Sequence, residues 1–226
     1  MKLLLFDIDG TLTTNNTAHM KAFNSVFREF FNVKDADIEK INHHGLTDEL
    51  LIYMILERHN IDRKIIEKNI NEARAFMIEK YKFFLKKHPV ILISGVKTFL
   101  KDVYSKNALG LVTGNLEEIA RIKLSSVNIW EYFYGGGFGS DSHDRYELIK
   151  IAIKRAENIY HKKFSINDIV LFGDTVRDIK AAEKLNIKII GIAGGIYSTN
   201  ELKQYGAHYV FRDFSNIKVL KEALKL

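Results

Sequence analysis

Cysteine is absent from the 226 residues of this sequence. Its absence excludes disulfide bridges and thiolate chemistry, so any bound metal ion must be held by oxygen atoms or by histidine nitrogens. It also fits a reducing compartment, and we expect a cytoplasmic protein.

Long hydrophobic runs are absent too. The first apolar run, Leu3 to Phe6, is followed at once by Asp7. Such a run is too short for a secretory signal or a membrane span, so we expect no membrane partner.

The sequence carries only a modest excess of one charge sign. Its 34 Lys and Arg residues face 28 Asp and Glu residues, which gives a formal net charge of +6. Because the lysines are dispersed and no nucleic-acid motif accompanies them, we expect no nucleic-acid partner.

Short apolar runs alternate with helical patterns along most of the chain. The runs are rich in Leu, Ile, Val and Phe and contain no proline, which is typical of strands buried on both faces. They lie at 2–6, 108–112, 168–172, 187–192 and 208–211, with helical patterns at 96–104, 116–125, 146–160, 176–185, 199–204 and 217–224. This alternation predicts an α/β fold with a Rossmann-like core, in which helices cover both faces of a parallel sheet.

The stretch before Pro89, the only proline, is almost wholly helical in pattern. Ala22, Phe23, Val26 and Phe27 recur at helical spacing, and we interpret this stripe as core packing. A helix usually ends before a proline, so Pro89 marks the return to the sheet. We expect residues 1–14 and 88–226 to form the core domain and residues 15–87 to form an inserted helical cap domain.

Acids, hydroxyls and glycines follow three of the predicted strands. They are Asp7, Asp9 and Thr11 after the first, Thr113, Gly114 and Asn115 after the second, and Gly173, Asp174, Thr175 and Asp178 after the third. The carboxyl ends of parallel strands meet at one edge of a sheet, where ligands bind in such folds. We therefore expect these side chains to surround one site.

The stretches F-D-I-D-G-T-L, V-T-G-N and G-D-T-V-R-D resemble the first, second and fourth motifs of the haloacid dehalogenase superfamily. The resemblance spans the chain and includes a helical cap inserted after the first motif, as in phosphoglycolate-phosphatase-like members. It implies a Mg²⁺-dependent phosphatase that hydrolyses a small phosphorylated metabolite through an aspartyl-phosphate. Among proteins that resemble this family, a sugar-phosphate mutase of the β-phosphoglucomutase type is the main alternative.

The resemblance also implies roles for the acids. Asp7 would be the nucleophile, and Asp9 would protonate the leaving alkoxide and later deprotonate the attacking water. Asp7, Asp174 and the backbone carbonyl of Asp9 would bind Mg²⁺, a hard cation that suits oxygen ligands. Asp178, four residues after Asp174, would turn back toward the metal ion or its waters.

The loop after the second strand predicts a phosphate-binding site. The Thr113 hydroxyl and the backbone amides of Gly114 and Asn115 would donate to phosphate oxygens at the start of a helix. Asn115 is also a good N-cap for that helix, with Glu118 completing a capping box.

The third motif departs from the family pattern of a lysine followed by proline, because neither begins the helix in G-S-D-S-H-D-R-Y-E-L. We choose Arg145 as the phosphate-binding cation, since Asp144 can cap this helix and place the guanidinium near the strand ends. Lys123 and Lys150 remain alternatives. Arg145 could instead form a surface ion pair with Asp141 or Asp144.

The turn H-H-G-L-T-D-E-L within the cap resembles the substrate-specificity loop of similarly capped phosphatases. His43, His44 and Thr47 would then contact the leaving group, although a solvated turn in which Thr47 caps a helix is equally compatible. We interpret the glycine run at 135–137 as a flexible connector, because it lacks the residues of a nucleotide-binding loop.

Asp9 bears on which other activities of similar proteins are compatible with the sequence. A dehalogenase or a phosphonate-cleaving relative would not need this second acid, so Asp9 argues against both. A non-catalytic binding module that kept the pocket is a further alternative, which the full set of acids disfavours. The sequence predicts neither the identity of the substrate nor the oligomeric state.

Overall fold

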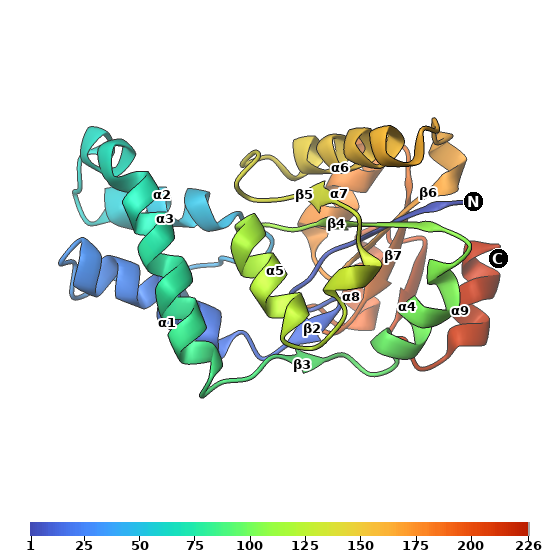
Figure 1. Ribbon diagram of the computed structural model, residues 1–226, viewed down its shortest axis with the longest axis horizontal. Helices are drawn as coiled ribbons and strands as arrows, with labels where there is room; N and C mark the ends of the chain where they lie inside the picture. Colours follow the sequence, from blue (N-terminus) through green and yellow to red (C-terminus); the bar gives the residue numbers. More distant parts are fainter. Residues whose placement is uncertain (226) are drawn as a thin grey trace.

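The computed structural model describes residues 1–225 and centres on a six-stranded sheet in the order β5-β4-β1-β6-β7-β8 (Figure 1). Every pairing in this sheet is parallel. The strands are β1 (Leu3–Phe6), β4 (Ala108–Val112), β5 (Gly136–Gly137), β6 (Ile169–Gly173), β7 (Lys188–Ile192) and β8 (Tyr209–Phe211). The expected Rossmann-like α/β class is confirmed, and the five predicted strands lie within one residue of their expected starts and ends.

The edge strand β5 was not expected. It pairs Gly136 with Leu111 and Gly137 with Val112, and both glycines are buried. A Cβ on Gly137 would lie 2.0 Å from the Leu148 carbonyl oxygen, so helix and strand approach closely because this residue has no side chain. The expectation of a flexible connector at 135–137 is therefore wrong, because a strand of glycines carries no apolar alternation that the sequence could reveal.

Helices cover both faces of the sheet. Leu4 and Phe6 of β1 belong to the apolar cluster beneath α4 (Val96–Tyr104), α5 (Glu117–Ser125) and α9 (Ile217–Leu224). Leu3 and Leu5 belong to the opposite cluster, beneath α6 (Arg145–Tyr160), α7 (Val176–Lys184) and α8 (Thr199–Gln204). Successive strand residues point to opposite faces, so a run of apolar residues is what a doubly covered strand requires.

The residues between Thr14 and Ile91 form a helical unit, which lies to one side of the sheet in Figure 1. It contains α1 (Thr17–Ser25), a π-helical turn (Val26–Phe30), a short 3₁₀ helix (Ile38–Lys40), α2 (Asp48–Arg58) and α3 (Arg63–Leu85). The unit has its own apolar cluster, which includes Phe23, Phe27 and Tyr81 and which Leu116 and Ile119 of the core also join. The aromatic stripe is therefore core packing, as predicted.

Two short strands connect the helical unit to the core. β2 (Thr13–Thr14) and β3 (Ile91–Leu92) pair in antiparallel fashion, and Asn15 Nδ2 donates to the Pro89 carbonyl oxygen at 2.7 Å. Both crossings of the chain between the two parts thus run side by side.

Three short 3₁₀ helices complete the described elements: the one in the helical unit, Trp130–Tyr132 and Ile166–Asp168. None of the helices within residues 1–225 combines the length and the apolar character needed to cross a bilayer.

The central position of β1 brings the candidate residues together. Phe6 is in register with Leu111 of β4 and with Phe172 of β6. The Asp7 N–H then donates to the Phe172 carbonyl oxygen at 2.9 Å, just before the chain reaches Asp174. The polar residues that follow these three strands consequently share one edge of the sheet.

Candidate active site

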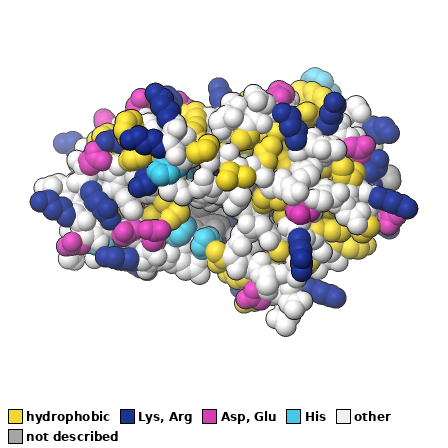
Figure 2. All heavy atoms as spheres, turned by 90° about the horizontal axis from the view of Figure 1, so that it is seen from below, with side chains coloured by type: hydrophobic (Ala, Val, Ile, Leu, Met, Phe, Trp, Pro, Cys, Tyr) yellow, Lys and Arg dark blue, Asp and Glu magenta, His cyan; other side chains and the backbone are white. Residues whose placement is uncertain are grey.

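A cavity of about 330 Å³ lies between this edge of the sheet and the helical unit. Figure 2 shows the hollow on one face, with histidine side chains at its rim. From the core it is lined by Asp7, Asp9, Thr113, Gly114, Asn115, Arg145 and Asp174, and from the helical unit by residues that include His19, Met20, Phe23, Ile38, His43, His44 and Leu51. The predicted residues Thr47 and Asp178 do not line it.

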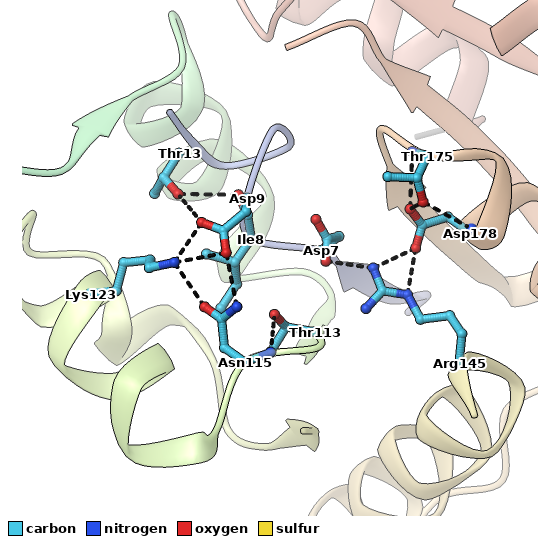
Figure 3. Close-up of polar contacts among 10 residues, drawn as sticks. All are labelled: Asp7, Ile8, Asp9, Thr13, Thr113, Asn115, Lys123, Arg145, Thr175 and Asp178. Atoms are coloured by element: carbon cyan, nitrogen blue, oxygen red, sulfur yellow. Dashed lines mark hydrogen bonds and ion pairs between the residues drawn. The ribbon is translucent and has the colours of Figure 1, made fainter. Parts of the chain in front are cut away.

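Arg145 is the buried cation beside Asp7. Its Nη2 donates to Asp7 Oδ1 at 2.6 Å and its Nε donates to Asp178 Oδ1 at 2.6 Å (Figure 3). The surface alternatives are excluded, because Arg155 pairs with Asp141 and because Asp144 accepts from the Tyr146 N–H as the N-cap of α6. Among residues 1–225, Arg145 Nη1 is a buried donor without a partner. This guanidinium edge is available to a ligand oxygen.

Asp178 is fully buried at the start of α7. Its Oδ2 accepts from the Thr175 N–H at 3.1 Å and from the Thr175 hydroxyl at 2.6 Å, which completes a capping box. Its other oxygen accepts from Arg145. Because donors within the protein engage both oxygens, the geometry suits Asp178 to holding Arg145 in place.

Lys123 is the second buried cation, and its side chain is 1% exposed. Its Nζ donates to both carboxylate oxygens of Asp9, at 2.6 and 2.7 Å, and to Asn115 Oδ1 at 2.9 Å. Figure 3 shows Asp9 directed toward Lys123 and Asp7 directed the opposite way, toward Arg145. Burial raises the pKa of Asp9, but Lys123, His19 and Asn115 outweigh it and hold that pKa below its ordinary value. The remaining alternative, Lys150, is exposed and pairs with Glu147.

Asn115 does not cap the helix that follows it. The N-cap is Leu116, which has no side-chain capping bond, and the expected capping box with Glu118 does not form. Instead, Asn115 Nδ2 donates to Asp9 Oδ2 at 2.9 Å. The prediction was wrong because a pattern along the helix cannot reveal that Asp9, 106 residues away, competes for the same side chain.

The loop after β4 lies against both the cavity and the helical unit. The Thr113 N–H donates to the Gly137 carbonyl oxygen at 3.0 Å, and the Thr113 hydroxyl accepts from the Asn115 N–H at 3.2 Å. A Cβ on Gly114 would lie 2.1 Å from the Leu46 carbonyl oxygen. Glycine at position 114 therefore allows the turn at 43–47 to rest directly on this loop.

Within the described chain, Asp174 is the acid of the site whose carboxylate lacks a partner for one oxygen. Its Oδ1 is buried and has no hydrogen-bond partner within residues 1–225. Burial, reinforced by the charges of Asp7 and Asp178, raises the pKa of Asp174 well above its ordinary value. Burial also raises the pKa of Asp7 to about 7, although Arg145 opposes the shift. A buried carboxyl without a compensating charge, as Asp174 is beside Asp7, is what a cation site requires.

These donors fit a hard divalent cation. Within residues 1–225, no group of three or more acidic or histidine side chains is arranged to hold a metal ion. Lys123 engages Asp9, and Arg145 engages Asp178. Asp7 and Asp174 remain as carboxyls that line the cavity. Mg²⁺ usually keeps several waters and takes only one or two carboxylates from a protein, so this set is sufficient.

Of the residues predicted in the turn at 43–47, the two histidines line the cavity and Thr47 does not. His43 and His44 line the cavity with their rings stacked at a centroid distance of 4.3 Å, and burial lowers the pKa of His44. Gly45 adopts a positive φ of 73°, as expected of this glycine. Thr47 is buried and accepts from the Leu50 N–H as the N-cap of α2. The capping interpretation of Thr47 thus matches its observed contact.

Asp48, which joins the helical unit to the core, was not predicted as a site residue. Its carboxylate Oδ2 accepts from the Leu116 N–H at 2.8 Å and lies 3.2 Å from His19 Nε2, and its own N–H donates to the Gly114 carbonyl oxygen at 2.8 Å. The only signal was an acid in the first turn of a helix, which ordinarily indicates favourable helix electrostatics.

Comparison with known proteins places this site in a family. The model of the haloacid dehalogenase-like hydrolases matches residues 4–192. The chain belongs to this family. The expected superfamily membership is thereby confirmed, and with it the expectation of an enzyme, a phosphatase-type hydrolase of this superfamily. Phosphatases of the family generally use a divalent metal ion.

Similar proteins cover nearly the whole chain. The pyrophosphatase PpaX of Oceanobacillus iheyensis is 23% identical over 224 residues, which are 96% of this chain and 95% of that protein. The phosphoglycolate phosphatase of Colwellia psychrerythraea is 23% identical over 223 residues, 96% of each chain. The crystal structure of a hydrolase from Pseudomonas syringae superposes with a TM-score of 0.74 at 19% identity and covers 98% of this chain and 99% of that one. At this identity the structural likeness shows the shared fold alone.

Proposed function

We propose that this protein is a Mg²⁺-dependent phosphatase that hydrolyses a small phosphorylated metabolite through an aspartyl-phosphate on Asp7. The observation that carries the proposal is the division of the two acids after β1: Asp7 lies beside Arg145, whereas Asp9 lies beside Lys123. Both line the same cavity. Two neighbouring carboxyls in different environments are suited to different steps of one reaction.

Asp7 acts as the nucleophile. One of its oxygens attacks phosphorus in line, the new Asp7–phosphorus bond forms, and the bond from phosphorus to the ester oxygen breaks. Arg145 orients the carboxylate through Oδ1 and offers its unpaired Nη1 to a phosphoryl oxygen. Because arginine does not give up a proton at neutral pH, it serves as a clamp.

Asp9 acts as the acid and the base. It gives a proton to the departing alkoxide and later takes one from the water that hydrolyses the phosphoenzyme. Lys123 favours the carboxylate form of Asp9, which is the form needed for the second step. Asn115 fixes the carboxylate from its other side.

The remaining residues bind the phosphoryl group and the cation. The Thr113 hydroxyl and the Gly114 amide would donate to phosphoryl oxygens at the edge of the sheet. Asp7, Asp174 and the Asp9 carbonyl would hold Mg²⁺, which when bound neutralises charge on the phosphoryl group. Asp178 would act through Arg145.

Residues 15–87 would serve as the cap over this site, with 1–14 and 88–226 as the core. The contacts of Asp48 with the loop after β4 support a closed position in which water is excluded from the reacting groups. Opening of the cap would then release product.

Orthophosphate release from 4-nitrophenyl phosphate, with and without Mg²⁺, tests the proposal. We expect Mg²⁺-dependent release that Asp7→Asn abolishes, while the exposed control Lys150→Met retains it. Full activity of Asp7→Asn would reject covalent catalysis by Asp7. A mutase would instead return the phosphoryl group to the substrate, so a shifted phosphate position without orthophosphate accumulation would favour that alternative.

A further inference from the structure

The charge of the cavity differs between its two ends. At the core end, the three lining carboxyls of Asp7, Asp9 and Asp174 lie near Arg145 and Lys123. Arg145 is the single lysine or arginine among the lining residues in the described chain, and it is already bound to Asp7 and Asp178. Within residues 1–225, Arg177 packs against Gly45 but is not a lining residue, and no lysine or arginine of the helical unit lines the cavity.

The histidines of the helical unit do not supply the missing charge. Burial lowers the pKa of His44, which favours its neutral form. His43 is held by its own turn, where Nδ1 lies 3.1 Å from the Ile41 carbonyl oxygen. His19 is buried against Asp48 and also acts on Asp9, so two acids of the protein already engage it and it is not free for a ligand.

Apolar side chains form much of the remaining wall. Met20 and Phe23 come from α1, Ile38 from the short 3₁₀ helix and Leu51 from α2. Phe23, Ile38 and Leu51 are nearly fully buried, so their positions are fixed by packing within the helical unit. Asn15 and Asn16 add neutral polar groups.

We infer that the substrate carries a single phosphoryl group on an uncharged, largely apolar leaving group, either aliphatic or aromatic. The inference rests on the proposed phosphatase function and narrows its substrate class. A second phosphate or a carboxylate on the leaving group would lose its hydration beside Asp48 and apolar side chains, where, within residues 1–225, no lysine or arginine of the helical unit lines the cavity to compensate it. Pyrophosphate and phosphoglycolate are therefore poor substrates of this cavity.

Matched esters provide the test. Butyl phosphate and 4-phosphonooxybutanoate differ by a terminal carboxylate on a leaving group of the same length, and phenyl phosphate and 4-carboxyphenyl phosphate form an aromatic pair. With the complete protein and Mg²⁺, we expect kcat/KM to be at least about ten-fold higher for the uncharged member of each pair, because the cavity offers no partner for the carboxylate. Equal or higher kcat/KM for the carboxylated members would overturn the inference.

A cation placed in the wall should reverse the preference. Met20 is half-buried, so we expect Met20→Lys to fold and to raise kcat/KM for the carboxylated ester relative to the uncharged one. Met20→Gln, which has a similar length and no charge, should leave the ratio unchanged. Asn16→Lys serves as a second variant, because Asn16 makes no side-chain capping bond at the start of α1. A ratio that neither lysine variant moves would contradict the inference.

Failure of the inference and failure of the proposed function have different signatures. If no ester releases orthophosphate in an Asp7-dependent manner, the proposed function falls and the inference falls with it. If the esters are hydrolysed and those with a carboxylate on the leaving group are preferred, the inference alone is overturned.

Discussion

Lys123 donates to both carboxylate oxygens of Asp9 while its own side chain is almost completely shielded from water. A lysine is rarely buried without a partner, because removing its charge from water costs several kcal/mol. The ion pair therefore ties the loop after β1 to α5, and it holds the carboxylate of Asp9 in one orientation.

Replacement of this lysine should slow turnover. In Lys123→Met, Asp9 loses the charge that lowers its pKa, so we expect kcat to fall by about 10- to 100-fold, part of the roughly 10²–10⁴-fold that a positioned acid or base contributes. The limb of the kcat–pH profile governed by Asp9 should move to higher pH. Lys123→Arg restores a positive charge and should bring the limb part of the way back to its original pH. A kcat–pH profile that does not move in Lys123→Met would show that Lys123 acts only through packing.

Removal of the other buried cation should destabilise the fold. Arg145→Met leaves Asp7 and Asp178 without a compensating charge, and we expect the free energy of unfolding at neutral pH to fall by about 3–5 kcal/mol, as for other broken buried ion pairs. Denaturant titration followed by circular dichroism measures the loss. Arg145→Met combined with Asp178→Asn should recover stability, because one of the buried charges is then removed, and an unchanged single variant would contradict the expectation.

Divalent cations should stabilise the protein more at pH 8 than at pH 6. In the absence of metal, the pKa of Asp7 is raised from 3.8 to about 7 and that of Asp174 is raised as well. Folding then favours the protonated forms, so their contribution to stability is complete below about pH 4 and is lost as the pH rises through 7. A cation competes with those protons and binds best after they leave.

Thermal unfolding with and without Mg²⁺ at the two pH values measures this difference. Asp174→Asn, which removes one of the proposed ligands, should lose most of the Mg²⁺-induced increase in Tm. An increase of the same size at both pH values in the unchanged protein would show that these carboxyls do not exchange protons for the cation.

Asp48 should hold the helical unit against the core. In Asp48→Ala the buried N–H of Leu116 loses its acceptor, and an unsatisfied buried donor costs about 1–3 kcal/mol. We expect a loss of stability of that size, together with faster amide hydrogen exchange at Leu116 and in the turn at 43–47. Asp48→Asn keeps an acceptor oxygen and should lose less, whereas equal exchange rates in all three proteins would argue against a holding role.

Local features of the site were readable from the sequence. The acids at positions 7, 9, 174 and 178 follow buried strands, and the ends of parallel strands necessarily share an edge. The N-cap roles of Asp144 and Thr47 were also predicted, because capping depends on residues two or three positions away. A single sequence thus predicts which residues lie at the end of a strand or at the start of a helix.

Pairing between distant residues could not be read in the same way. Lys123 and Asp9 are 114 positions apart, and Arg145 and Asp7 are 138 positions apart. Arg145 was chosen because it begins a helix near the strand ends, whereas Lys123 remained only an alternative cation for the phosphate. Which acid a buried cation meets depends on how helices pack on the sheet, and helical periodicity specifies a face without specifying its neighbour.

The paired strands β2 and β3 determine how the two parts of the molecule can move. Because the outgoing and returning segments are bonded to each other, and Asn15 is bonded to the Pro89 carbonyl, they cannot swing independently. The helices carry their own apolar interior, so they would travel as one rigid lever about this two-stranded ribbon. A bend of a few degrees at the ribbon would be magnified at the far side of the cavity, where the turn with His43 and His44 meets the loop that follows β4.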